Sequence, residues 1–144
     1  MRGIVRSSLA LPLVRQTAVQ IVQGTGFNVS AQLRLLQQYI QQYTEFLRDP
    51  RGVELLHTPA YLLTQIAERG TVAGDCDDIA MLVAALGMAV GLRARFVVIG
   101  QRALEHVFTM LASPRGTEWV AFDPTRPGPD IAASMLRYTL VVEV

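Results

Sequence analysis

The sequence contains no lysine, and all 13 of its basic residues are arginine. A chain without lysine offers no side-chain amine as an acyl acceptor, so it cannot cross-link itself through lysine. The 12 acidic residues nearly balance the arginines and leave a formal net charge of +1. Binding to nucleic acid depends on a basic excess or a basic stripe. The charge therefore gives no support for a nucleic-acid partner.

Cysteine and histidine are also scarce. The single cysteine, Cys76, excludes a disulfide within the chain. Zinc could be held only by Cys76, His57, His106 and an aspartate, but no CxxC motif or short histidine spacing supports that site. The aspartates around Cys76 could instead bind a hard cation, although we expect them to cap a helix and to pair with Arg93 or Arg95. We therefore expect neither a metal nor another cofactor.

Long apolar runs are missing as well. No stretch approaches the roughly 20 apolar residues of a membrane-spanning helix. Residues 7–14 are apolar and follow two arginines, but the segment is short, contains Pro12 and lacks a clear small-residue cleavage site, which argues against a signal peptide. The hydrophobic share of 51% and the length of 144 residues are typical of one globular domain. We expect a single domain over residues 1–144, cytoplasmic and without a membrane partner.

Helical periodicity dominates the first half of the chain. Apolar residues recur at three- and four-residue steps, and the expected helices cover residues 11–23, 30–47 and 58–67. Ser30 is the expected N-cap of the second helix. Pro59 occupies the first helical position of the third, where proline is favoured.

The second half of the chain predicts one buried helix and a sheet. Residues 79–90 (IAMLVAALGMAV) are apolar on every side, which is typical of a helix buried all round. Strands are expected over residues 94–99, 105–111, 118–122 and 138–144. The predicted fold class is α+β, with a helical N-terminal half and a buried, cysteine-bearing helix packed on a small antiparallel sheet.

Cys76 lies where the buried helix is expected to begin. In the sequence GDCDD, Asp75 would be the N-cap, Cys76 the first helical residue and Asp78 the third. Unpaired N–H groups and the positive end of the helix dipole stabilise a thiolate there, and the thiolate is the nucleophile. The neighbouring aspartates oppose this, so a paired imidazolium is needed to outweigh them. A cysteine that only fills the core is the alternative, but the polar, glycine-preceded position argues against it.

His106 is the better of the two candidate bases. It opens a predicted strand, whereas His57 lies in a loop-to-helix connection, where a surface or capping role is expected. Asp123 ends the next strand and could orient the imidazole. If the two strands form a hairpin, placing His106 opposite Asp123 puts the turn within residues 113–116, which have the composition of a turn. A turn role for Asp123 is the alternative.

These motifs together resemble the transglutaminase-like superfamily, with its papain-like Cys–His–Asp fold. The shared blocks are GDCDDIA (74–80), GLRARFV (91–97), HVF (106–108) and WVAFDPT (119–125). They occur in the family's order, with the nucleophile first, the base second and the orienting aspartate third. Residues 49–54 with residues 58–59 look like the upstream part of small phage and prophage members, so the resemblance covers about residues 49–125.

The resemblance implies a thiol enzyme that acts on amide bonds, as a cysteine amidase or peptidase or by acyl transfer. Cys76 would attack the carbonyl carbon, His106 would move the proton, and Asp123 would fix the imidazole tautomer. The backbone N–H of Cys76 would contribute to an oxyanion hole. Three side chains are candidates for a further donor: Gln38, Tyr61 and Gln65.

The same resemblance implies which molecules the protein would bind. The substrate would be a peptide or protein amide, and phage structural proteins are the other implied partners. The alternative function is that of a structural or assembly protein of a phage particle, which retains the fold with little or no catalysis. In that case the protein would be associated with the virion.

Overall fold

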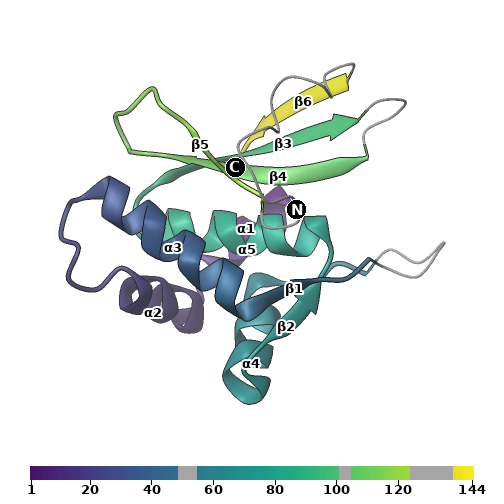
Figure 1. Cartoon of the computed structure of the whole chain (residues 1–144), viewed down its shortest axis with the longest axis horizontal. Coiled ribbons are helices and arrows are strands. Elements are labelled where there is room, and N and C mark those ends of the chain that lie inside the picture. Colours follow the sequence, from purple (N-terminus) through teal and green to yellow (C-terminus); the bar gives the residue numbers. More distant parts are fainter. Residues whose placement is uncertain (49–54, 101–104, 124–137) are drawn as a thin grey trace.

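Helices and a small antiparallel sheet make up the computed structural model, which describes residues 1–48, 55–100, 105–123 and 138–144 (Figure 1). The helices are α1 (Arg2–Ser8), α2 (Pro12–Ile21), α3 (Val29–Tyr43), α4 (Pro59–Arg69) and α5 (Cys76–Ala89). The strands are β1 (Thr44–Phe46), β2 (Val72–Gly74), β3 (Arg93–Gly100), β4 (His106–Ala112), β5 (Val120–Phe122) and β6 (Tyr138–Glu143). The α+β fold class predicted from the sequence is confirmed.

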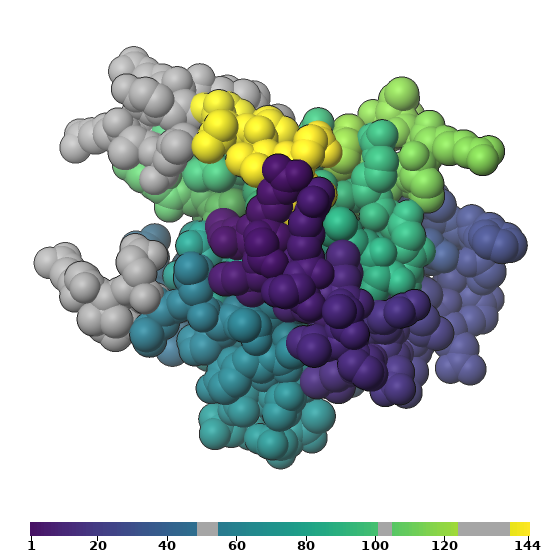
Figure 2. Space-filling model, turned by 180° about the vertical axis from the view of Figure 1, so that it is seen from behind, coloured from purple at the N-terminus to yellow at the C-terminus, as the bar shows by residue number. Residues whose placement is uncertain are grey.

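Helix α5 forms the centre of the fold. Its residues from Asp78 to Gly87 are all buried, as the all-round apolar sequence predicts. The sheet covers one side of α5, and the other helices cover the rest (Figure 1). Seen from behind, α1 and α2 lie across the molecule between β6 above and α4 below (Figure 2). None of the helices in the described ranges is long and apolar enough to cross a membrane.

The larger sheet has the strand order β5-β4-β3-β6, and every neighbouring pair is antiparallel. Its strands agree with the sequence expectation to within one or two residues at each end. The face toward α5 carries alternating buried side chains, among them Phe96 on β3 and Leu111 on β4. On the same face the buried hydroxyl of Thr109 donates a 2.7 Å hydrogen bond to the carbonyl of Ala80 in α5. This bond fixes β4 against the helix.

The beginning of the chain differs from the expectation. Residues 2–8 form α1, which the sequence patterns do not predict, and Val5 on this helix is fully buried. Helix α3 begins one residue after Asn28, whose side chain accepts a hydrogen bond from the backbone N–H of Ala31. The predicted N-cap, Ser30, is therefore wrong, because an asparagine two residues earlier performs the same capping.

The end of α3 also differs from the prediction. The apolar periodicity predicts a helix that continues to Leu47, but α3 ends at Tyr43. The next three residues form β1, which pairs in parallel with β2 and sets Phe46 opposite Gly74. The pairing partner lies about 30 residues further along the chain, so local periodicity cannot reveal it. Phe46 and Leu47, the last apolar residues of the predicted helix, are exposed.

At Gly87, α5 packs tightly against the sheet. A Cβ atom at this position would lie 2.7 Å from the Cδ2 atom of Leu111, which is itself fully buried. We predict that Gly87→Ala destabilises the fold by about 1–3 kcal/mol through overpacking, although alanine is the better helix former. Gly3 in α1 is the matched control, because nothing lies within 4 Å of its added Cβ. Chemical denaturation should show Gly3→Ala to be neutral or stabilising, and an equal response of the two variants would contradict this packing.

Candidate active site

Cys76 is the first residue of α5, and Asp75 caps that helix as predicted. One carboxylate oxygen of Asp75 accepts hydrogen bonds from the backbone N–H groups of Asp77, at 3.0 Å, and of Asp78, at 3.2 Å. The Cys76 side chain is half-buried at this helix end. The cysteine thus lies at the positive end of the helix dipole, with a cap that orders the first turn around it.

His106 and Asp123 form a buried pair beside this helix start. The Nε2 atom of His106 lies 2.6 Å from Oδ2 of Asp123, and their side chains are 9% and 1% exposed. His106 opens β4, and Asp123 directly follows β5, which pairs with β4. The His106 ring also interacts with the Cys76 side chain. Because Asp123 occupies Nε2, the nitrogen left for the thiol is Nδ1.

The strand register differs from the predicted one. The sequence places His106 directly opposite Asp123, whereas the structure pairs Thr109 with Phe122. One residue further along, Asp123 therefore lies opposite Phe108. This is a shift of two residues, and side chains two apart share a face of the sheet. Asp123 still reaches His106, as a diagonal rather than a direct neighbour.

The surroundings of His106 change its pKa. Burial alone lowers the pKa, but the hydrogen bond with Asp123, the interaction with Cys76 and the charges of both groups outweigh it and raise the value from 6.5 to about 9. His106 is therefore an imidazolium at neutral pH. It therefore brings a positive charge to the helix start, where the aspartates around Cys76 add negative charge.

His57 occupies a separate position. Its backbone N–H donates to Oδ1 of Asp78 at 2.7 Å, and its ring Nδ1 lies 2.7 Å from Oδ2 of the same carboxylate. The ring stacks on Tyr61, with the ring centres 4.9 Å apart. The two histidines thus pair with different carboxylates. Among the residues that the structure describes, no group of three or more potential metal ligands forms, so the zinc alternative has no support there.

The three candidate side-chain donors for an oxyanion hole lie on α3 and α4, and each has its own surroundings there. Gln38 is exposed on α3. Tyr61 stacks on His57. Gln65 is buried in α4, and its amide nitrogen lies 3.4 Å from a carboxylate oxygen of Glu68. Within the part of the chain that the structure describes, these contacts do not bring any of the three to Cys76.

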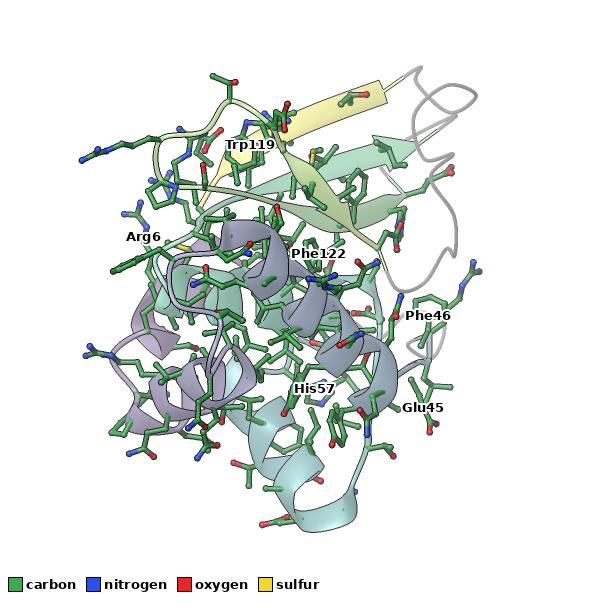
Figure 3. The ribbon with its side chains drawn as sticks, turned by 60° about the vertical axis from the view of Figure 1, so that its left-hand side comes forward. Arg6, Glu45, Phe46, His57, Trp119 and Phe122 are labelled. Carbon is green, nitrogen blue, oxygen red and sulfur yellow. The ribbon has the colours of Figure 1, made fainter. Side chains whose placement is uncertain are left out.

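Two other glutamines lie beside the site. Gln37 and Gln41 line a recess of about 20 Å³ together with Ile40, Phe122 and Asp123. In Figure 3, Phe122 lies between the sheet and α3. The four-residue spacing of Gln37 and Gln41 puts both on one side of the helix. That spacing is the signal in the sequence that could have identified Gln37 and Gln41 as a pair on one side of α3.

Arg93 and Arg95 do not form the predicted ion pairs with the aspartates of α5. Their guanidinium groups lie over the ring of Trp119, at 4.8 and 4.1 Å from its centre, which is the geometry of cation–π contacts. Arg93 also donates a hydrogen bond to the carbonyl of Gly116. The two arginines therefore hold the β4–β5 connection against β3, and Trp119 marks this place at the top of the sheet in Figure 3.

The sequence profile of the transglutaminase-like superfamily matches residues 15–124, which is most of the chain and includes all three candidate residues. The chain therefore belongs to the transglutaminase-like superfamily. The match begins well upstream of residue 49, where the resemblance of the motifs begins.

A solved structure shares the fold. It is a protein from Cytophaga hutchinsonii described as a "putative cysteine protease", which superimposes with a TM-score of 0.58 and 21% sequence identity. The superposition covers 91% of this chain and 50% of that one. The present chain thus spans about half the length of that protein. A search of curated protein sequences finds no match.

The raised pKa of His106 gives a prediction about titration. NMR of the ring should show His106 losing its proton near pH 9, and Asp123→Asn should lower that pKa because the charge and part of the hydrogen bond are lost. Since the folded pKa exceeds the unfolded value of 6.5, protonation of His106 adds stability that is complete below pH 6.5 and lost as pH rises through 9. The signal of His57 is the internal reference. A His106 pKa that Asp123→Asn leaves unchanged would contradict the pairing.

Proposed function

We propose that this chain is a thiol enzyme of the transglutaminase-like superfamily that acts on amide bonds. Cys76 is the nucleophile, His106 carries the proton, and Asp123 holds the imidazole in place. The observation that carries the proposal is the buried 2.6 Å contact between His106 and Asp123 beside a cysteine at a helix start. This arrangement meets the general requirement of a nucleophile, a base within reach and a third group that orients the base.

The reaction follows from these positions. The sulfur of Cys76 attacks the amide carbonyl carbon, a C–S bond forms, and the carbonyl oxygen takes the negative charge. The backbone N–H of Cys76, at the first position of α5, is placed to stabilise that oxyanion. His106 then gives its Nδ1 proton to the leaving nitrogen, the C–N bond breaks, and a thioester and an amine result.

The second half of the reaction returns the enzyme to its starting state. His106, now neutral, accepts a proton from an attacking water or amine, the C–S bond breaks, and the thiolate re-forms. Water gives a carboxylic acid, and an amine gives a new amide. Throughout, Asp123 holds Nε2 and keeps Nδ1 directed at the reacting groups. In acyl transfer the amine must come from another molecule, because the chain has no lysine.

The alternative of a phage structural or assembly role rests on the sequence resemblance alone. No contact within the described residues favours it over the enzymatic role. A buried imidazole–carboxylate pair next to a lone cysteine is also costly to keep in a protein that only serves assembly. We therefore develop the enzymatic role.

Alkylation of Cys76 tests the proposed pair. Iodoacetamide should modify the wild-type protein readily at pH 6, because the imidazolium of His106 interacts with the attacking sulfur. The His106→Ala variant should react at least about tenfold more slowly at pH 6 and regain rate only as pH rises. Intact-mass measurements follow the reaction, and Cys76 is the only cysteine that can be modified.

Thr64→Ala is a suitable control for a general effect of substitution, because Thr64 only donates to a carbonyl within its own helix, α4. Its alkylation rate should match the wild type at every pH. Wild-type alkylation that is slow at pH 6 and indifferent to His106 would refute the catalytic pair.

The position of Asp77 gives a second prediction, which concerns the rate at which the thiol of Cys76 is alkylated. The thiol of Cys76 donates a long hydrogen bond, 4.0 Å from sulfur to oxygen, to Oδ1 of Asp77. The negative charge of this carboxylate therefore lies close to the attacking sulfur. Asp77→Asn should therefore speed alkylation at pH 6 by a few-fold to about tenfold. Glu68→Gln in α4 removes the same charge elsewhere and should leave the rate unchanged. Slower alkylation of Asp77→Asn would show that the carboxylate assists the nucleophile instead.

A further inference from the structure

Two chain segments are fastened to the residues on either side of Cys76. The backbone N–H of Leu47 donates a 2.9 Å hydrogen bond to the carbonyl of Gly74, two residues before the cysteine. The backbone N–H of His57 donates a 2.7 Å hydrogen bond to the carboxylate of Asp78, two residues after it. The end of β1 and the start of the α4 segment are therefore both held at the first turn of α5.

Four large apolar side chains at these two attachments are exposed. They are Phe46, Leu47, Leu55 and Leu56, with exposed fractions between 44% and 64%. We call these four residues the apolar rim. Single exposed apolar residues are ordinary on a protein surface, but hydrogen bonds tie the two segments that carry these four to residues two positions before and two positions after Cys76. In Figure 3, Phe46 points outward from the edge of the molecule.

The position of the apolar rim relative to His106 limits which part of a substrate the rim can contact. The leaving nitrogen of an amide must face His106, which belongs to the sheet. The β1–β2 pair lies on the other side of the start of α5 from the sheet (Figure 1). The part of the substrate that remains on the sulfur, the acyl part, therefore extends away from the sheet and toward the rim.

We infer that the apolar rim binds apolar side chains in the acyl part of a peptide substrate, next to the amide that Cys76 attacks. This inference rests on the proposed function and adds a substrate class to it. Burying one leucine-sized side chain favours binding by roughly tenfold or more. A peptide with two apolar residues before the reactive position should therefore be strongly preferred to one with two serines.

Two matched thiol-reactive peptides test the inference: acetyl-Leu-Leu-Gln vinyl sulfone and acetyl-Ser-Ser-Gln vinyl sulfone. Both place the peptide on the acyl side of Cys76, and intact-mass spectrometry gives the rate at which each modifies the protein. We expect the leucine peptide to react at least about tenfold faster with the wild type. The double variant Leu55→Ser, Leu56→Ser should bring the ratio close to one. Its rate with iodoacetamide, which needs no peptide site, should stay at the wild-type value.

Leu13→Ser provides the matched control, because Leu13 is also an exposed leucine but lies on α2, away from the start of α5. It should keep the full preference for the leucine peptide. Equal rates for the two peptides, or a preference that survives in the Leu55→Ser, Leu56→Ser variant, would overturn the inference. Such results, together with alkylation that still depends on His106, would leave the proposed function intact. Loss of the His106 dependence would count against the proposed function itself.

Discussion

The packing of α5 against β4 determines where the candidate nucleophile meets its base. Cys76 begins the helix and His106 begins the strand, so their distance depends on how the two elements are aligned. The hydrogen bond from Thr109 to the carbonyl of Ala80 fixes that alignment a few residues from both ends. Further along, the absence of a side chain at Gly87 lets the helix approach Leu111 closely. The all-round apolar sequence of α5 is what keeps it in this central place.

The electrostatics of the site follow from the same alignment. The helix start brings Asp75, Asp77 and Asp78 close to Cys76, which is unfavourable for a thiolate. Each carboxylate has a defined contact: Asp75 caps the helix, Asp77 lies 4.0 Å from the sulfur of Cys76, and Asp78 holds His57. His106, with its pKa raised to about 9, brings a positive charge to the same place. The hydrogen bond with Asp123 is one of the interactions that raise this pKa.

Much of this fold could be predicted from the sequence, because its signals are local. The apolar run of α5, the aspartate cap before Cys76 and the strands of the larger sheet all follow from composition and period. The features that the sequence did not reveal depend on distant partners. Strand β1 forms because it pairs with β2, which lies far along the chain. The register between β4 and β5 depends on the turn that joins them, and the composition of that turn is compatible with two registers that differ by two residues. The pair of His106 and Asp123 was predictable in spite of that error, since a shift of two preserves the face.

The central claim is that Cys76 forms a covalent acyl intermediate with the help of His106. Trapping that intermediate tests it most directly: the protein is mixed with activated acyl donors such as peptide p-nitroanilides, quenched in acid and examined by intact-mass and peptide mass spectrometry. The account predicts a mass increase equal to the acyl group on Cys76, removable by hydroxylamine as a thioester is, and absent in His106→Ala. A protein that releases p-nitroaniline without acylation of Cys76, or that is acylated equally well without His106, would contradict the account.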